Sequence, residues 1–362
     1  MPNSVYIHIP FCKSKCHYCS FISFNKLELK NDYLKSLGYE IEHIYKGEEL
    51  KTLYIGGGTP SNLTPQETEK IINNFNTSKD TEITMELNPE ESNYEYLKSL
   101  YKVGINRISI GAQTFNDKIL KLINRRHNSE QIIDVVKNSQ KAGFDNISLD
   151  FIYGLPNQSE EEFYDNLKQA INLDIKHISL YGLSIEHNCY FAKHPPDDLP
   201  DDEQQADMYL GSINLLEKHN YKQYEFSNFC IKGYESKHNL NYWNCEEYYG
   251  FGTASHGYVN NTRYNKPETV EEYIKNPLLR LNEHVLTLQE KLEEEIFLGL
   301  RKTEGIDINR INMKYNIDFN KKYSRIIKKY TDLNLLIETS KGYKLHPNGI
   351  LLSNTILSEF LE

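Results

Sequence analysis

The chain has 362 residues, of which 39% are hydrophobic and 25% charged, a composition typical of a soluble globular protein. Its formal net charge of −10 argues against a basic face for non-specific nucleic-acid binding, so no nucleic-acid partner is expected. The sequence has neither an apolar run long enough for a transmembrane helix nor a signal peptide at "MPNSVYIHIPFC". We therefore predict a cytoplasmic protein with reduced thiols.

Short strand patterns alternate with helical patterns over the first half of the chain. Strands rich in Val, Ile, Leu and Tyr are predicted at residues 5–9, 52–56, 82–87, 107–111, 147–154 and 177–183. Helices are predicted at residues 28–47, 65–76, 92–103, 116–123, 129–143 and 160–173. Before the second helix, "TPQE" offers a Thr cap, a Pro at the first helical position and an acid in the first turn. Six β-α units in series predict an α/β fold with a parallel sheet, either a barrel or a doubly wound sheet.

The unusual loops all follow predicted strands. The cysteine-rich loop follows the first strand, "GGGTP" the second, "AQTF" the fourth and "YGLP" the fifth. Because parallel strands end at a common edge of the sheet, where ligands bind, these loops predict one active site.

The second half of the chain has a weaker pattern. The Pro- and Asp-rich stretch 187–204 predicts a loop, and a helix is predicted at 201–219. From about residue 285 helical patterns surround a short hairpin at 335–345, which suggests a small winged-helix-like α+β domain. It lacks a dense basic stripe, so we expect a structural role. The predicted organisation is a core at 1–225, a connecting segment at 226–284 and a C-terminal domain at 285–362.

Three of the six cysteines are clustered. Cys12, Cys16 and Cys19 have the spacing C-x3-C-x2-C, whereas Cys189, Cys230 and Cys245 are scattered and have no assigned role. Clustered cysteines in a reducing compartment suggest metal ligands. Three thiolates on an iron–sulfur cube would leave one iron without a protein ligand. The alternatives are a zinc site with His17 as fourth ligand, and buried cysteines without a metal.

The cysteine spacing followed by "GGGTP" resembles the radical S-adenosylmethionine (SAM) superfamily. The blocks "YIHIPFC", "YIGGGTPS", "ELNPE", "RISIGAQTFNDKIL", "LDFIYGLPNQ" and "HISLYGL" are similar to those of its coproporphyrinogen dehydrogenase (HemN)-like branch, in the same order. The resemblance implies a partial (β/α)6 radical-SAM barrel, a [4Fe-4S] cluster and SAM on its open iron. It also implies an electron donor such as a flavodoxin or ferredoxin.

The resemblance also assigns residues to the cofactors. The glycine-rich loop would hold the methionine end of SAM, because glycine lets the backbone approach a ligand closely. Glu86 and Asp150 would accept hydrogen bonds from ribose hydroxyls. Arg125, rather than its neighbour Arg126, would bind a carboxylate with two hydrogen bonds. The alternative for Glu86 is a capping or salt-bridge acid. The predicted SAM contacts are Tyr6, Gly57, Gly58, Thr59, Glu86, Gln113, Arg125 and Asp150.

A second motif, "HNLNYW" at 238–243, contains the only tryptophan of the chain. Taken alone it is typical of a packed loop, although a histidine beside aromatic rings can also ligate haem iron. It resembles the signature of the HemW-type haem chaperones. Two further features agree: Phe21 stands where the decarboxylating relatives have another cysteine, and only eleven residues precede Cys12. We therefore assign His238 as a haem contact, with His256 as runner-up.

The sequence thus favours a haem chaperone that passes haem to an acceptor protein, with no residue assigned as catalytic. The alternatives are an oxygen-independent coproporphyrinogen III dehydrogenase, working by radical oxidative decarboxylation, and a structural zinc protein.

Overall fold

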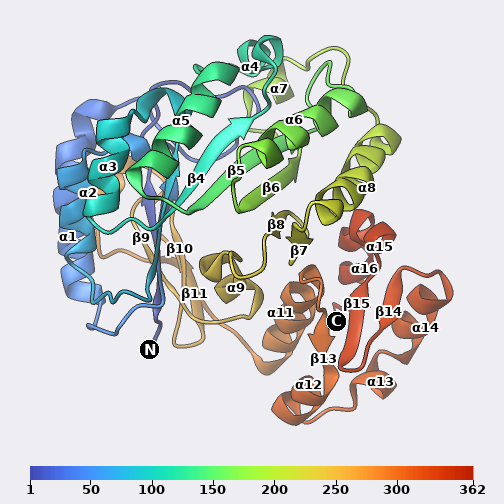
Figure 1. Cartoon of the computed structure of the whole chain (residues 1–362). Helices are drawn as coiled ribbons and strands as arrows, with labels where there is room; N and C mark the ends of the chain where they lie inside the picture. Colours follow the sequence, from blue (N-terminus) through green and yellow to red (C-terminus); the bar gives the residue numbers. More distant parts are fainter. Residues whose placement is uncertain (362) are drawn as a thin grey trace.

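A nine-stranded sheet forms the centre of the molecule, with the strand order β7-β8-β6-β5-β4-β3-β2-β1-β9 (Figure 1). The computed structural model describes residues 1–361, with the backbone alone at residue 91. Six strands stand in chain order and are parallel to their neighbours: β1 (Ser4–Ile9), β2 (Thr52–Gly57), β3 (Glu82–Leu87), β4 (Arg107–Gln113), β5 (Asn146–Tyr153) and β6 (His177–Gly182). The predicted series of β-α units and its parallel sheet are therefore confirmed.

Helices follow each of the first five parallel strands and pack on one face of the sheet (Figure 1). They are α1 (Lys30–Ile44), α2 (Pro65–Ile72), α3 (Tyr94–Lys102), α4 (Asp117–Leu122), α5 (Ser129–Ala142) and α6 (Glu160–Asn172). All six lie within the predicted helical ranges, and most are shorter because the end turns fray into loops.

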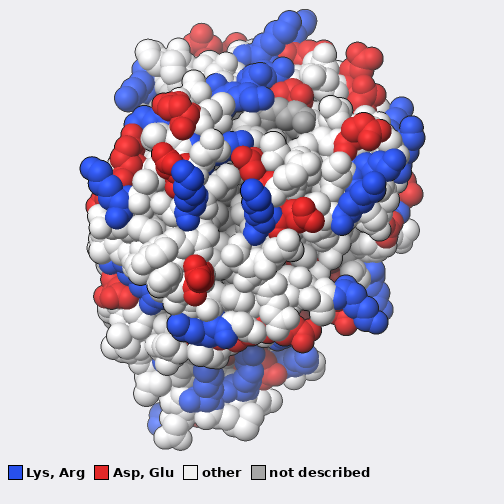
Figure 2. Space-filling view, turned by 90° about the vertical axis from the view of Figure 1, so that its left-hand side faces the viewer, with Lys and Arg blue, Asp and Glu red and all other residues white. Residues whose placement is uncertain are grey.

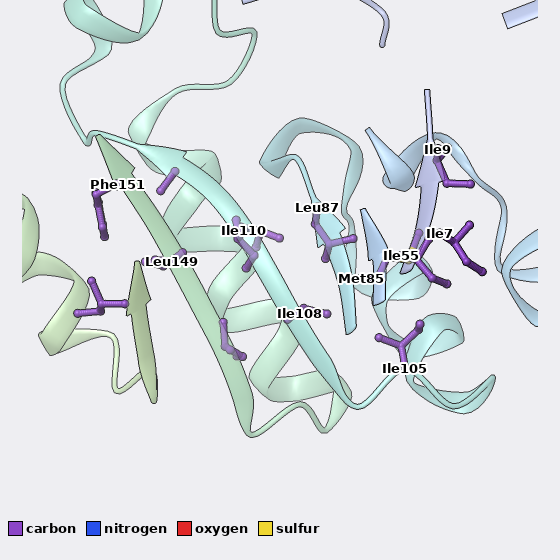
Figure 3. Packing of buried hydrophobic residues seen from close by; sticks show 14 of the residues in the cluster. Ile7, Ile9, Ile55, Met85, Leu87, Ile105, Ile108, Ile110, Leu149 and Phe151 are labelled. Atoms are coloured by element: carbon purple, nitrogen blue, oxygen red, sulfur yellow. The ribbon is translucent and has the colours of Figure 1, made fainter. Parts of the chain in front are cut away.

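The parallel strands alternate apolar and polar residues. Apolar side chains such as Ile55, Met85 and Ile108 are fully buried between the sheet and the helices, and Figure 3 shows them following neighbouring strands. The intervening positions carry polar groups, among them Glu86 and Ser109, which are register partners on β3 and β4. A parallel sheet covered on both faces normally reads as continuous apolar runs. The alternation here shows that the second face lines a polar interior.

The cap predicted for α2 is present as a full capping box. Thr64 Oγ1 accepts from Glu67 N at 3.2 Å, and Glu67 Oε2 accepts from Thr64 N at 2.7 Å. We expect Thr64→Ala to lower the free energy of unfolding by about 1 kcal/mol, because the helix start loses a backbone partner. Chemical denaturation measures this, with Thr77→Ala in the following loop as control. Equal stability of the two variants would contradict the capping argument.

The segment 226–284, predicted as a connecting segment, contributes strands to both ends of the sheet. β8 (Asn228–Cys230) pairs antiparallel with β6, and β9 (Tyr249–Phe251) pairs parallel with β1. β7 (Lys222–Gln223), just before the segment, pairs antiparallel with β8. A second sheet contains β10 (His256–Val259), β11 (Thr262–Asn265) and β12 (Leu281–Val285). The helices of the segment are α9 (Lys237–Trp243) and α10 (Val270–Lys275), and α7 (Tyr190–Lys193) and α8 (Asp202–Lys218) precede it. The helix predicted at 201–219 is α8.

A buried ion pair ties this segment to α1. Lys266 Nζ lies 2.7 Å from Glu40 Oε1, and both side chains are almost fully buried. Tyr273 donates its hydroxyl to Glu40 Oε2 at 2.6 Å. The pair is satisfied by hydrogen bonds, as a buried charge requires.

The C-terminal residues surround a hydrophobic cluster of their own, which includes Ile296, Phe319, Tyr343 and Phe360. The elements are α11 (Leu288–Arg301), β13 (Ile306–Asp307), α12 (Ile308–Tyr315), α13 (Phe319–Lys322), α14 (Ser324–Asp332), β14 (Leu336–Glu338), β15 (Gly342–Leu345), α15 (Pro347–Leu351) and α16 (Ser353–Ser358). β14 and β15 form the predicted hairpin, and β13 completes an antiparallel sheet. This order of helices and strands agrees with the winged-helix-like prediction.

Charged residues of both signs are interspersed over the face of the molecule that lies to the left in Figure 1 (Figure 2). Among residues 1–361, no helix combines the length and the apolar character that a membrane crossing requires.

Candidate functional site

A pocket of about 440 Å³ opens at the carboxyl ends of β2–β6. It brings together most of the residues that the sequence singled out. Those in its lining are Cys12, Cys16, Cys19, Gly57, Gly58, Thr59, Glu86, Gln113, Arg125 and Asp150. The cysteine loop, "GGGTP" and "AQTF" each contribute to this lining, as expected from the sequence. No residue of "YGLP" is among the lining residues.

The cysteine loop is fastened to the end of α4. Asn124 donates its side-chain amide to the carbonyl of Lys15 at 2.8 Å, and His17 N donates to the carbonyl of Ile123 at 3.1 Å. The His17 ring bonds the carbonyl of Leu122 at 2.9 Å and stacks on Tyr190. His17, the fourth ligand in the zinc alternative, thus has other partners and lies outside the pocket lining.

The three thiols surround part of the pocket without meeting at one point. The described residues contain no group of three or more His, Cys, Asp and Glu side chains placed to hold a single metal ion. Cys12 Sγ lies 3.3 Å from Thr59 Oγ1, and Arg125 Nη1 donates to Cys16 Sγ at 3.5 Å. A four-iron cube binds each thiolate at a different iron, so thiols spread around a pocket fit it.

Burial affects the ionisation of two of these thiols. It raises the pKa of Cys12, and it raises the pKa of Cys19 to about 11. Without a metal the thiols of Cys12 and Cys19 are protonated at neutral pH. A soft metal centre would supply the positive charge that makes them thiolates, which suits iron–sulfur chemistry.

The glycine-rich loop is closely packed against the cysteine loop. Gly57 has φ +116°, a left-handed conformation that favours glycine. A Cβ at Gly57 would lie 2.9 Å from the His8 ring, and one at Gly58 would lie 3.0 Å from Cys12 Sγ. The glycines therefore let β1, β2 and the cysteine loop approach each other, in addition to the ligand approach expected from the sequence.

Glu86 is a half-buried carboxylate with specific partners. It accepts from Tyr54 Oη at 2.8 Å and from Gly57 N at 3.1 Å. Burial raises the pKa of Glu86 to about 7, and the nearby charge of Asp150 adds to the increase. The alternative for Glu86 was a capping or salt-bridge acid. Within the described residues its side chain makes no ion pair and caps no helix.

Asp150, on β5, lines the same pocket two strands away from Glu86. Ser109 donates to its two oxygens at 3.1 and 2.9 Å, and Ser148 donates to Oδ1 at 3.1 Å. Burial raises the pKa of Asp150, and these hydroxyls compensate in part. Hydrogen bonds from neighbouring residues hold both carboxyl groups in place. They are therefore suited to accept hydrogen bonds from hydroxyl groups of a ligand.

Arg125 and Gln113 occupy the wall between the carboxylates and the cysteines. Arg125 Nη2 donates to Asn88 Oδ1 and to the carbonyl of Gly111, both at 2.8 Å. Gln113 has φ +67° and sits beside a register shift at the end of β4. The neighbouring Arg126 also lines the pocket but is exposed. The choice of Arg125 over Arg126 agrees with the deeper position of Arg125.

Tyr6 and His238 lie outside the pocket lining. Tyr6 stacks on Tyr54 with ring centroids 6.0 Å apart, and its hydroxyl bonds His8 Nδ1 at 3.1 Å. His238 is 1% exposed, and its ring lies beside both of these tyrosines, 5.0 Å from the Tyr54 ring and 6.5 Å from the Tyr6 ring. Contacts of these two side chains to a ligand stay predictions. His256, the runner-up, is exposed at the start of β10.

Several residues of the site were not predicted from the sequence. Tyr54, Asn88 and Ser109 line the pocket, and His8 supports the cysteine loop by bonding the carbonyl of Ile22 at 3.0 Å. The signal that would have found most of them is the alternation of polar and apolar residues in the strands. It places Tyr54, Glu86, Ser109 and Asp150 on one face.

Comparisons with known proteins agree with this architecture. Residues 6–170 match the family model of the radical SAM superfamily, and residues 286–352 match the HemN C-terminal domain. The solved structure of coproporphyrinogen III oxidase (HemN) from Escherichia coli has the same fold, with a TM-score of 0.87 and 24% identity over 99% of this chain and 90% of that chain. The fold and the cysteine-lined pocket thus define a radical SAM protein with a HemN-type C-terminal domain.

Curated relatives narrow the assignment. The chain is 38% identical to the heme chaperone HemW of Lactococcus lactis over 99% of this chain and 97% of the relative. It is 37% identical to the heme chaperone HemW of Bacillus subtilis over 99% of both chains. The chain belongs to the HemW family.

Proposed function

We propose that this protein is a cytoplasmic haem chaperone, which binds haem and a [4Fe-4S] cluster with SAM on the open iron and transfers the haem to an acceptor protein. The observation that carries the proposal is the 38% identity, over 99% of the chain, to a relative named heme chaperone HemW. The "HNLNYW" motif and Phe21, which is 68% exposed at the pocket mouth, also support it.

The pocket residues fit the two cofactors. Cys12, Cys16 and Cys19 would ligate three irons of the cluster, and Thr59 and Arg125 would donate hydrogen bonds to the ligated sulfurs. The other predicted SAM contacts that line the pocket would hold SAM together with Thr59 and Arg125; they are Gly57, Gly58, Glu86, Gln113 and Asp150. On reduction by an electron donor such as a flavodoxin or ferredoxin, the bound cluster and SAM would supply a 5′-deoxyadenosyl radical.

His238 is our candidate for the residue that contacts haem iron. We expect the wild-type protein to bind haem and His238→Ala to bind it at least about tenfold more weakly, because the iron loses its axial nitrogen. Titration with haem, followed by absorbance, measures the affinity and the number of haems bound per chain. His256→Ala is measured beside it and tests the exposed runner-up, so a loss of affinity in that variant instead would move the assignment to His256. Unchanged affinity and stoichiometry in His238→Ala would reject the assignment.

The competing function is the oxidative decarboxylation of coproporphyrinogen III. It has one specific observation in its favour, a pocket that is lined by every predicted SAM contact except Tyr6. An anaerobic assay with reductant would separate the two functions. Protoporphyrinogen formation by the reconstituted protein would favour the enzyme. SAM cleavage without that product would exclude it.

A further inference from the structure

A chain of hydrogen-bonded side chains runs from the pocket carboxylate Asp150 across β5 and β6. Ser148 Oγ lies 3.1 Å from Asp150 Oδ1 and 2.8 Å from His177 Nδ1. The other ring nitrogen of His177, Nε2, lies 2.8 Å from Tyr224 Oη, in the loop between β7 and β8. Ser236 N, at the start of α9, donates to the same hydroxyl at 3.2 Å. The chain therefore joins the pocket to residues that do not line it.

The register of the two strands places these groups on one face of the sheet. Ser148 and His177 are partners in the pairing of β5 with β6. Asp150 lies two residues after Ser148, so its side chain points to the same side. Ser148 and His177 are both fully buried. A buried polar group without a hydrogen-bond partner is costly, so we expect these contacts to persist in solution.

The Tyr224 end of the chain determines which nitrogen of His177 carries the hydrogen. The Tyr224 hydroxyl accepts from Ser236 N and has a hydrogen of its own to donate. Within the described residues its one other hydrogen-bond partner is His177 Nε2, so this nitrogen is the acceptor. Burial holds the pKa of His177 well below its ordinary value, so the ring is neutral and carries a single N–H. That N–H is therefore on Nδ1.

The Asp150 end of the chain leads to the same tautomer. When Nδ1–H donates to Ser148 Oγ, the single hydroxyl hydrogen of Ser148 can donate to the Asp150 carboxylate, which only accepts when it is ionised. Ser179 Oγ, at 3.3 Å, is the longest of the three side-chain contacts of Ser148. Every hydrogen bond from Tyr224 to Asp150 then points toward the carboxylate, and aligned bonds of this kind strengthen one another.

The other ionisable groups around Asp150 act in opposite directions. The buried guanidinium of Arg107, on β4, favours the ionised carboxylate, whereas the Glu86 carboxylate disfavours it. Burial adds to the second effect and raises the pKa of Asp150. Tyr54 and Tyr181 also face it and stay neutral, because burial raises their pKa. Within the described residues the direct partners of the carboxylate are hydroxyl groups, so their orientation decides how well it is held as an anion.

We propose that His177 is a positioning residue for SAM: through Ser148 it supplies the hydrogen bond that holds Asp150 as an ionised acceptor for the ribose hydroxyls. This inference rests on the proposed SAM site and names what fixes its carboxylate. His177 does not line the pocket, so its effect reaches SAM only through the hydrogen on Nδ1.

The test compares two amide replacements of His177. The side-chain amide of Asn can take the place of Nδ1 and donate to Ser148, whereas that of Gln reaches the place of Nε2 and leaves Ser148 without this donor. We expect His177→Asn to bind SAM as the wild type does and His177→Gln to bind it about fivefold more weakly, the effect of one hydrogen bond. Equilibrium binding to the cluster-loaded proteins measures this. Equal affinities of the two variants, or weaker binding by His177→Asn, would overturn the inference.

Ser148→Ala removes the link between the imidazole and the carboxylate. It should weaken SAM binding about tenfold, because a charged group loses one of its donors. The matched control is Ser139→Ala on α5. Ser139 is equally buried, and its hydroxyl donates to the carbonyl of Val135, away from the pocket. The control should bind SAM as the wild type does, and the same affinity in Ser148→Ala would contradict the proposed link.

The tautomer of His177 can be measured without SAM. Nitrogen NMR of the chain with isotope-labelled histidine, at about pH 8, distinguishes a protonated ring nitrogen from an unprotonated one, and the signals absent from His177→Gln belong to His177. We expect a protonated Nδ1 and an unprotonated Nε2, and the reverse would overturn the inference whether or not SAM binds. A wild-type protein that carries a full cluster but binds no SAM would instead reject the SAM site of the proposed function, and with it this role of His177.

Discussion

Cys16→Ala is expected to abolish the iron–sulfur cluster. The wild-type protein, reconstituted anaerobically with iron and sulfide, should contain about four irons per chain and show brown charge-transfer absorbance. Without the Cys16 thiolate only two protein ligands remain, too few to retain a cube. Arg125, which donates to Cys16 Sγ, would also lose its sulfur partner. Iron and sulfide analysis with absorbance spectra measures the loss.

Cys245→Ala is the matched control for this variant. Cys245 lies in the turn after α9, outside the pocket lining, and burial raises the pKa of its thiol to about 12. The control should keep the full iron content. A wild-type protein that takes up one zinc and no sulfide would instead support the structural zinc alternative, and a full cluster in Cys16→Ala would contradict the ligand assignment.

Glu86→Gln is expected to weaken SAM binding about ten- to a hundredfold. The carboxylate is placed to accept ligand hydroxyls, and hydrogen bonds to a charged acceptor contribute about 1.5–3 kcal/mol. The pKa of Glu86 in the ligand-free protein is about 7, so the carboxylate becomes more populated as pH rises through neutrality. SAM affinity of the wild type should therefore increase between pH 6 and pH 8. Equilibrium binding to the cluster-loaded protein measures both effects.

The comparison with Glu186→Gln separates this role from a general loss of negative charge. Glu186 lines the mouth of the same pocket but is exposed. Its replacement should leave both the affinity and its pH dependence close to those of the wild type. If Glu86→Gln retains the pH dependence, another group is responsible for it.

The same carboxyl group affects stability with the opposite sign. The pKa of Glu86 rises from 4.5 to about 7 on folding, so between these values the folded state binds more protons than the unfolded state. Its contribution is fully present below about pH 4.5 and is lost as pH rises to 7, a decrease of about 3 kcal/mol. Denaturation of the ligand-free proteins should show a shallower pH slope for Glu86→Gln.

The local signals of the sequence were sufficient for the β-α series. Caps such as Thr64, strand composition and helix length act within a few residues, so they predict elements such as β3 and α5 nearly to the residue. The rule that parallel strands end at one edge then placed the cysteine loop, the glycine-rich loop and Glu86 around one pocket. Short strands near the ends of the sheet, such as β8 and β9, of three residues each, carry too little local signal to be predicted.

The sequence by itself determined the class of the protein, because the cysteine spacing and the ordered blocks around it are local patterns. Only the tertiary structure decided where "HNLNYW" lies. Its helix sits at the amino ends of the strands, with His238 bonded to Thr52 and Tyr242, and with Trp243 against Arg301. Thr52 and Arg301 come from β2 and α11, far away in the chain, and the burial of His238 makes hydrogen-bond partners necessary for its ring. No spacing within the motif encodes that burial, which is why the motif indicated a haem contact but not the partners that hold its histidine in the structure.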